Sequence, residues 1–184
     1  MRASGGNGAH LENVELLGLF LLSFARACVN LHALVGSEFE PLLAGVEPMG
    51  WVSASRFMAV RAAITRRYRD FEPILERIGI EMMKLWYEQG PGRSVVTRAV
   101  DFLHYQTGSS GYSSVVRGPA EHVGSFTLVA VDLEEGSAVV CSTTPFDRAM
   151  ERGVLIGGLQ AAGDTVYVDV DNSADPDIFQ IRLH

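Results

Sequence analysis

The chain has 184 residues, of which 47% are hydrophobic. This length suffices for one well-buried core and is short for two, so we expect a single soluble domain. The formal net charge is −7, and residues 118–184 contain 3 basic and 11 acidic residues. The one basic cluster, at residues 56–69, alternates with apolar residues at helical spacing, which is typical of a solvated helix face. Because nucleic-acid binding needs clustered lysines and arginines on the binding surface, we expect no nucleic-acid partner.

Neither the first ten residues nor the apolar stretch that follows them has the pattern of a targeting signal or a membrane span. The first ten residues, MRASGGNGAH, lack the basic and then apolar organisation of a secretory signal. We therefore expect a disordered leader over residues 1–10 and one domain over residues 11–184. The longest apolar stretch starts at Leu16 and is broken by Arg26, so it favours a buried helix over a membrane span.

The two cysteines, Cys28 and Cys141, lie far apart and match no C-x-x-C pattern. Such cysteine usage is typical of a protein in a reducing compartment. We therefore expect the protein to be cytoplasmic.

The first half of the chain has the periodicity of helices. The segment 12–34 is apolar almost all round, which predicts burial on more than one side, either in the core or against a second subunit. We expect a homodimer made through the helix at Leu16–Leu34. Three further helices are predicted at residues 53–68, 71–90 and 93–108.

Beyond the fourth helix the period becomes 2, which is typical of strands. Segments 125–133 and 137–143 predict one antiparallel hairpin, and segments 165–171 and 178–184 predict another. A helix over residues 145–164 lies between the two hairpins. This order predicts an α+β fold in which an N-terminal helical half packs on a C-terminal antiparallel sheet of two hairpins, with one inserted glycine-containing helix.

The inserted helix contains several glycines, although an interior glycine costs a helix about 1 kcal/mol relative to alanine. A phosphate-binding loop is excluded, because G-x-x-x-x-G-K-[ST] is absent and the glycines lie inside the helix. Gly153 and Gly157 lie four residues apart and leave one face of the helix without side chains. Two interpretations stay open: close packing of this face on the sheet, or a strip that lines a ligand cavity.

No motif indicates catalysis or a metal site. The sequence DVDNSADPD at residues 169–177 resembles a calcium loop, but Ala174 and Gln180 stand where that loop needs Gly and Glu. G-x-S-x-G is absent, and no two histidines have the spacing of metal ligands. His104 lies near the end of the helix at 93–108, where a histidine is either hydrogen-bonded at the helix end or directed into a pocket. We therefore predict no enzyme and no metal site.

The order of elements resembles a known ligand-binding fold. A helical half is followed by a hairpin, a helix of the type P-F-D…E-R-G-V-L-I-G-G, and a second hairpin. This order is similar to that of haem nitric-oxide/oxygen-binding (H-NOX) sensors, 4-vinyl-reductase domains and vesicle-tethering TRAPP subunits. The helix is most similar to that of a less characterised bacterial branch of this group.

The resemblance to the haem sensors implies two features of a haem site. An axial histidine ends the helix before the sheet, and His104 occupies a similar place. A Tyr-x-Ser-x-Arg motif binds the haem propionates. Tyr112 and Ser114 fit its first two positions, but Val116 stands where Arg is expected and Arg117 comes one position late. This departure counts against haem as a cofactor.

The resemblance to the 4-vinyl-reductase and tethering branches implies an apolar cavity between the helices and the sheet. We predict a non-catalytic sensory or regulatory domain that holds an apolar or flat small molecule there. Two alternatives stay open: a haem-based gas sensor ligated by His104, and a ligand-free dimeric interaction scaffold. The residues predicted to line the ligand site are Trp86, Phe102, His104, Tyr112, Cys141, Gly153 and Gly157.

Overall fold

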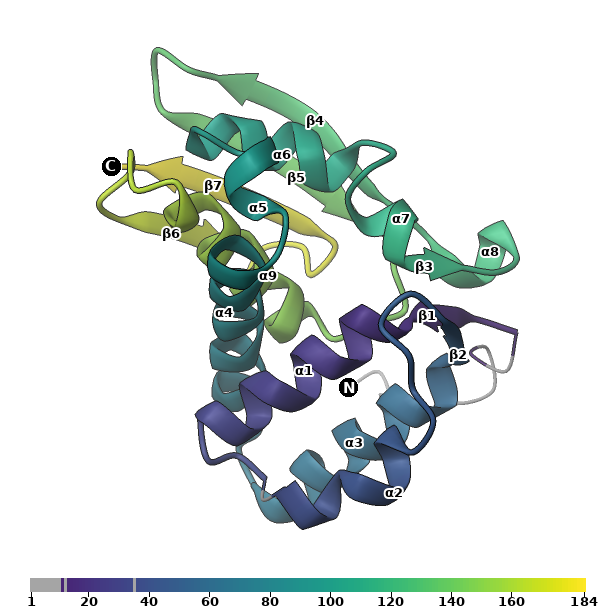
Figure 1. Ribbon diagram of the computed structural model, residues 1–184. Helices are drawn as coiled ribbons and strands as arrows, with labels where there is room; N and C mark the ends of the chain where they lie inside the picture. The colour runs from purple at the N-terminus through teal and green to yellow at the C-terminus, as the bar shows by residue number, and fades with distance from the viewer. Residues whose placement is uncertain (1–10, 12, 35) are drawn as a thin grey trace.

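The computed structural model describes residues 11, 13–34 and 36–184 (Figure 1). The predicted leader at residues 1–10 lies outside the described residues. Along the described chain, helices come first and an antiparallel sheet with one inserted helix follows. The structure therefore confirms the α+β fold.

Four helices occupy the predicted places in the first half with shorter bounds, but the helix expected over residues 93–108 is wrong at its start, because residues 96–98 are not helical and separate a short helix, Gly92–Val95, from the rest. The four helices are α1 (Gly18–Asn30), α3 (Ala54–Arg67), α4 (Glu72–Gln89) and α6 (Ala99–Thr107). Local sequence sets their starts: the Ser53 hydroxyl oxygen accepts a hydrogen bond from the Ser55 backbone N–H and caps α3, and Pro73 lies in the first turn of α4. Short helices occupy the connections, namely η1 (Gly36–Glu38), α2 (Glu40–Leu43), α5 (Gly92–Val95), α7 (Tyr112–Val115) and α8 (Ala120–Val123).

The two predicted hairpins join into one four-stranded antiparallel sheet. Its strands are β4 (Phe126–Asp132), β5 (Ser137–Ser142), β6 (Val168–Asp171) and β7 (Ile178–Leu183), in the order β4-β5-β7-β6. The inserted helix is α9 (Arg148–Ala161), between β5 and β6. Val140 pairs with Phe179 where the hairpins meet, and both side chains are fully buried. This contact joins the hairpins over the core.

A small second sheet was not predicted. It consists of β1 (Glu15–Leu17), β2 (Trp51–Ser53) and β3 (Val116–Arg117), in the order β2-β1-β3. The expected helix over residues 12–34 is therefore wrong at its start, because Glu15–Leu17 pairs with strands far away in the sequence and the helix begins at Gly18. Such pairing leaves no local periodicity in segments of two or three residues.

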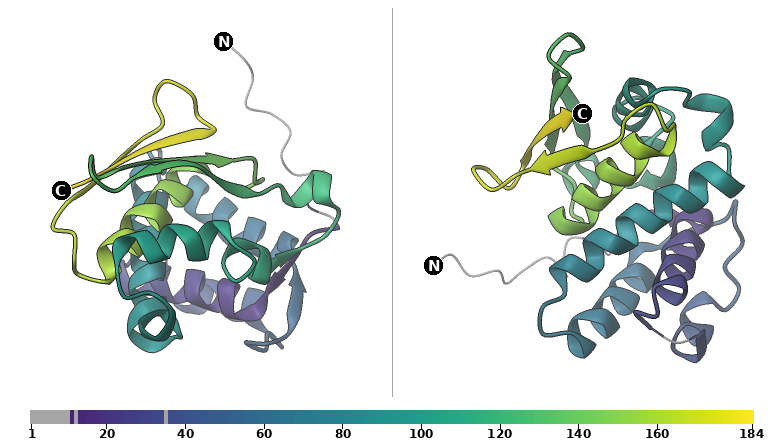
Figure 2. Two further views of the ribbon diagram at one scale, coloured as in Figure 1. Left: turned by 90° about the horizontal axis from the view of Figure 1, so that it is seen from above. Right: turned by 90° about the vertical axis from the view of Figure 1, so that its left-hand side faces the viewer.

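The elements form three layers (Figure 2). The four-stranded sheet is one layer, α6 and α9 cover one of its faces, and α1, α3 and α4 lie beyond them. In α1, Leu21, Phe24 and Cys28 are fully buried, whereas Leu19 is 39% and Val29 is 42% exposed. Packing within the chain therefore accounts for much of the apolar character of α1, and the homodimer stays a prediction.

Among the described residues, no helix is long and apolar enough to cross a membrane.

The glycine strip of α9 packs on α4, and the expectation that it packs on the sheet is wrong. A Cβ atom at Gly153 would lie 2.0 Å from the backbone oxygen of Glu76, and one at Gly157 would lie 2.8 Å from the Cα atom of Ile80. A Cβ atom on Gly79 of α4 would in turn lie 2.3 Å from the backbone of α9. Small residues four apart let two helices approach backbone to backbone, which leaves no room for a ligand at this crossing.

Candidate functional site

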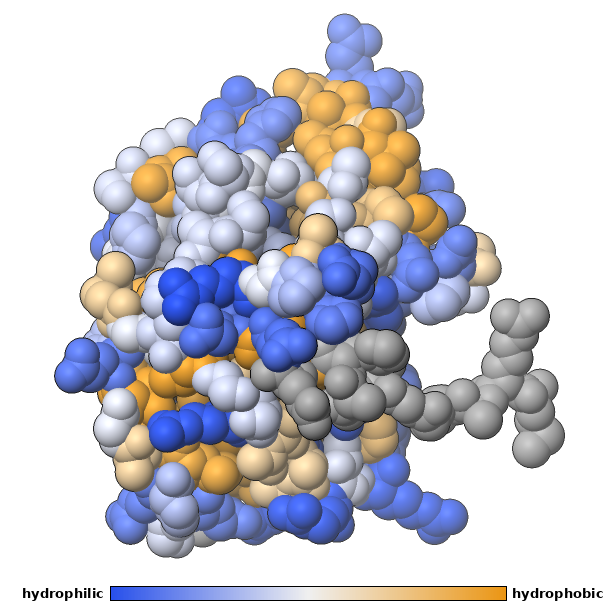
Figure 3. All heavy atoms as spheres, turned by 90° about the vertical axis from the view of Figure 1, so that its right-hand side faces the viewer, coloured by the Kyte–Doolittle hydropathy of each residue, from blue (hydrophilic) through white to orange (hydrophobic). Residues whose placement is uncertain are grey.

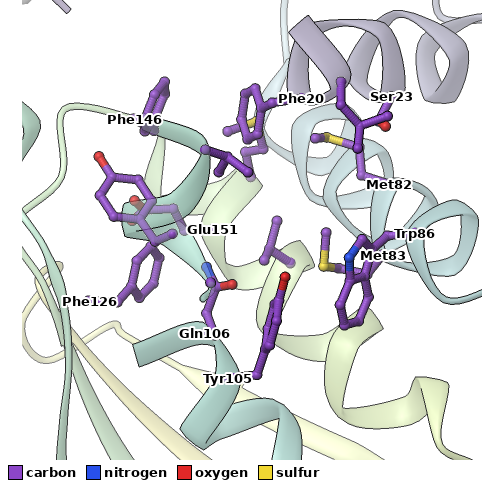
Figure 4. Close-up of a pocket in the computed structure, with 16 residues that line it drawn as sticks. Phe20, Ser23, Met82, Met83, Trp86, Tyr105, Gln106, Phe126, Phe146 and Glu151 are labelled. Carbon is purple, nitrogen blue, oxygen red and sulfur yellow. The ribbon is translucent and has the colours of Figure 1, made fainter. Parts of the chain in front are cut away.

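A cavity of about 100 Å³ lies between the N-terminal helices and the C-terminal half of the chain. Helices α1 and α4 form one wall, and α6, α7, α9 and the start of β4 form the other (Figure 4). Most of the lining side chains are apolar or aromatic, as in small-molecule sites. The lining residues are Leu19, Phe20, Ser23, Met82, Met83, Trp86, Tyr105, Gln106, Gly111, Tyr112, Val115, Phe126, Phe146, Met150, Glu151 and Val154.

Aromatic rings hold part of the wall in place by contacting one another. The ring centroids of Tyr112 and Phe126 are 5.5 Å apart, and those of Phe20 and Phe146 are 5.8 Å apart. These separations are within the range of favourable aromatic pairs. The Tyr112 hydroxyl donates a hydrogen bond to the Val123 carbonyl, which fixes its ring against the cavity. This part of the wall is preformed.

Three methionines, Met82, Met83 and Met150, give the cavity an adaptable part. A methionine side chain is unbranched and polarizable, so it fits ligands of differing shape and makes favourable sulfur contacts with aromatic rings. Figure 4 shows Met82 and Met83 on the same side of the cavity as Trp86. The cavity can therefore enlarge modestly without movement of the backbone.

Glu151 is the one carboxylate among the residues that line the cavity, and it is only 2% exposed. It accepts hydrogen bonds from the Ser142 hydroxyl at 3.0 Å and from the Thr144 hydroxyl, and it forms an ion pair with Arg148 at 2.9 Å. Burial raises the pKa of Glu151 to about 7, although Arg148 and the two hydroxyls act in the opposite direction. Arg148 also pairs with Asp177 at 2.8 Å. The carboxylate is thus held by β5, the loop that follows it and α9 itself.

Gln106 on α6 is another buried polar residue that lines the cavity, and it is 9% exposed. Within the described part of the chain its side chain makes no hydrogen bond. Figure 4 shows its amide group directed into the cavity, between Phe126 and Tyr105. Because a side-chain amide carries two donors and one acceptor, Gln106 presents unused hydrogen-bonding capacity to whatever fills the cavity.

The structure brings two of the seven predicted ligand residues, Trp86 and Tyr112, to this cavity. Phe102 lies one turn before Gln106 on the buried face of α6, where it is fully buried and its ring packs against Gly158 instead of lining the cavity. The side chain of His104 is exposed and lines a separate surface depression with Asp101. Neither Phe102 nor His104 lines the cavity.

The other three predicted residues also lie elsewhere. Cys141 is partly exposed on β5, and it alternates with the buried Val140 and Ser142, so it faces away from the helices. Gly153 and Gly157 lie at the crossing with α4 described above. Gly157 borders a separate pocket between α4 and α9, which it lines together with Ile80 and Lys84.

The sequence-based interpretation missed Gln106 and Glu151. For Gln106 a signal was present, because buried residues on α6 recur at Ala99, Phe102, Leu103 and Gln106, the spacing of one helix face. The same spacing places His104 on the outer face. For Glu151 no local signal existed, because its hydroxyl partners come from the preceding strand and loop.

The comparisons with known proteins find matching structures but no matching sequence. No model of a known protein family matches the chain, and neither does a curated protein. A variant of the H-NOX protein from K. algicida, in the unliganded Fe(II) state, matches with a TM-score of 0.66 at 8% sequence identity, covering 92% of this chain and 97% of that chain. An oxygen-binding H-NOX domain related to soluble guanylate cyclases, in its oxygen complex, matches with a TM-score of 0.64 at 11% identity, covering 91% and 94%. The chain has the H-NOX fold.

A third matching structure belongs to an investigation of haem distortion in the H-NOX family, with a TM-score of 0.66 at 12% identity, covering 91% of this chain and 94% of that chain. At such identities the likeness extends to the fold alone. The predicted resemblance to H-NOX proteins is therefore confirmed for the fold. The resemblance to 4-vinyl-reductase domains, TRAPP subunits and a bacterial branch stays a prediction.

The residues of this chain do not fit haem in the way that the resemblance implies. His104 is outside the cavity, and no histidine is among the residues described as lining it. Ser114 donates its hydroxyl proton within its own loop, to the carbonyls of Ser110 and Gly111. Arg117 pairs with Glu15 at 2.7 Å. The chain therefore offers neither the expected axial ligand nor the expected propionate contacts.

Metal binding also finds no support, since the described residues contain no group of three or more His, Cys, Asp or Glu side chains that could hold an ion.

Proposed function

We propose that the chain is a non-catalytic sensory or regulatory domain that binds a small apolar or flat molecule in the cavity between its helices and its sheet. The observation that carries this proposal is the cavity itself, with a wall of aromatic and methionine side chains and the buried polar residues Gln106 and Glu151. The fold supports it, because the matching structures include an oxygen-binding domain. Binding would act by changing how α1 and α4 pack against the C-terminal half.

The volume limits the ligand. Typical sites for drug-sized ligands enclose about 300–1,000 Å³, whereas an engineered apolar cavity of about 150 Å³ holds benzene. A cavity of about 100 Å³ with movable methionines therefore suits a single-ring molecule.

Haem as the ligand is the second reading, and the geometry disfavours it. Haem is far larger than a single ring, and His104 is not available in the cavity. We expect purified protein to be colourless and to show no Soret band after titration with haemin. A saturable Soret band that is lost in His104→Ala would overturn this expectation.

The third reading, a ligand-free dimeric scaffold, is less well supported, because a scaffold has no need of a cavity that contains the unpaired Gln106 amide.

A cavity-filling variant tests ligand binding directly. Ser23→Leu places a larger apolar side chain into the cavity from α1, and Arg26→Leu places the same side chain on the exposed face of that helix as a control. A panel of single-ring compounds, each at about 100 times its dissociation constant, should raise the unfolding temperature of the wild type by about 5–10 °C. We expect this shift to persist in Arg26→Leu and to vanish in Ser23→Leu. Equal shifts in both variants would place the binding outside the cavity.

A further inference from the structure

We infer that the cavity selects a neutral, flat molecule that carries one uncharged hydrogen-bonding group, and that Gln106 is the residue that selects it. This inference rests on the proposed function, and it adds the chemical class of the ligand and the residue that recognises that class.

The first step concerns the Gln106 amide. It is 9% exposed and without a hydrogen-bond partner among the described residues, and it points into the cavity (Figure 4). A ligand that fills the cavity without pairing with this amide leaves it buried and unpaired, which costs about 1–3 kcal/mol, so a ligand that pairs with the amide gains affinity relative to one that does not. A hydroxyl or carbonyl group complements an amide, since the amide both donates and accepts. The amide therefore favours a ligand with one such group over a pure hydrocarbon.

The second step concerns charge. No lysine, arginine or histidine is among the residues that line the cavity in the described chain. The only carboxylate there, Glu151, is already paired with Arg148 and accepts two hydroxyl hydrogen bonds. An anionic ligand would lose its hydration without gaining a cation, and it would lie close to a second carboxylate. The cavity therefore rejects carboxylates such as fatty acids.

The third step concerns shape. Tyr105 and Trp86 stand with their ring centroids 4.9 Å apart on one side of the cavity, and Phe126 stands on the other side of the Gln106 amide (Figure 4). Flat rings pack favourably against such aromatic walls. A ring with a single substituent can place that substituent at Gln106 and its apolar edge toward the methionines.

Phenol, toluene and benzoate form a matched set of probes for this inference. Phenol and toluene are nearly equal in size and differ in hydrogen bonding, and benzoate adds a negative charge. Isothermal titration calorimetry at pH 7 should show phenol binding about 10-fold more tightly than toluene, with no binding of benzoate.

Gln106→Met keeps the length of the side chain and removes its hydrogen-bonding groups. We expect this variant to bind phenol and toluene with equal affinity, so that the 10-fold preference is lost. Gln160→Met is the control, because Gln160 lies on α9 beside a separate pocket and does not line the cavity, and it should keep the preference. If Gln106→Met does not fold, Gln106→Leu, which also removes the hydrogen-bonding groups, should likewise bind phenol and toluene with equal affinity.

The two proposals fail in distinguishable ways. If the wild type binds toluene and phenol equally well and Gln106→Met changes neither affinity, the cavity binds ligands and the role given to Gln106 is wrong. Binding of benzoate as tight as that of phenol would likewise overturn the selection for neutral molecules. If none of the three probes binds to the wild type, both the inference and the proposed function lose their support.

Discussion

Glu151 lines the cavity, and its raised pKa makes the stability of the fold depend on pH. Its pKa is raised from 4.5 to about 7 by burial. Between these two values the folded protein holds a proton that the unfolded chain has released. The folded state is therefore favoured at the acidic end of this window, and that contribution is lost as the pH rises through 7. A shift of this size corresponds to about 3 kcal/mol at most.

Glu151→Gln should remove this pH dependence, since the amide does not titrate. We expect the free energy of unfolding of the wild type to fall by about 2–3 kcal/mol relative to the variant between pH 5 and pH 8. Urea unfolding at both pH values measures the difference. Glu121→Gln, at an exposed position, is the control and should leave the pH dependence as in the wild type. If the free energies of unfolding of the wild type and of Glu151→Gln differed by the same amount at pH 5 and pH 8, the raised pKa of Glu151 would not be the cause of the pH dependence.

The crossing of α4 and α9 shows how two helices depend on the absence of side chains. Glycines lie on both partners, Gly79 on α4 and Gly153 and Gly157 on α9, and each is too close to the other backbone for a Cβ atom. An ion pair between Arg152 and Glu76, at 2.5 Å, joins the same two helices. The low helix propensity of these glycines is thus offset by packing that no larger residue permits.

Gly153→Ala tests this crossing. The change favours an isolated helix by about 1 kcal/mol, but the added methyl group would overlap the Glu76 backbone oxygen, so α9 must move away from α4. We expect a net loss of about 1–3 kcal/mol of unfolding free energy. Gly50→Ala is the control, because its added methyl group would come no closer than 3.4 Å to another residue. A stabilised Gly153→Ala protein would contradict the backbone contact.

In the whole molecule α9 connects the two halves, and exposed apolar side chains of the described surface include one group on α1 and another on β4. Asp147, at the start of α9, pairs with Arg61 of α3 at 2.5 Å, which ties the C-terminal half to the N-terminal helices. One exposed apolar region lies on α1, at Leu19 and Val29. The other lies on β4, where Val129, Val131 and Leu133 are exposed, and Figure 3 shows an apolar patch over this upper part of the sheet.

The predicted homodimer can be tested by comparing these two regions. If dimerisation uses α1, light scattering should give twice the chain mass of 20.0 kDa for the wild type and the single mass for Val29→Glu. Val131→Glu, on β4, should leave the dimer intact. The opposite pattern would move the interface to the sheet, and a single mass for the wild type would remove the dimer.

The main helices, the two hairpins and the inserted helix were determined by the sequence alone, because periodicity and end signals such as Ser53 and Pro73 act over a few residues. Of the residues predicted to line the ligand site, Trp86 and Tyr112 lie at the cavity. The spacing of apolar residues on α6 already placed Gln106 on the buried face and His104 on the outer face. Only the tertiary structure decided that Gly153 and Gly157 face α4, that a cavity forms beside Gln106, and that Glu15–Leu17 is a strand. These features depend on contacts between segments far apart in the chain, and such contacts leave no periodic trace in either segment.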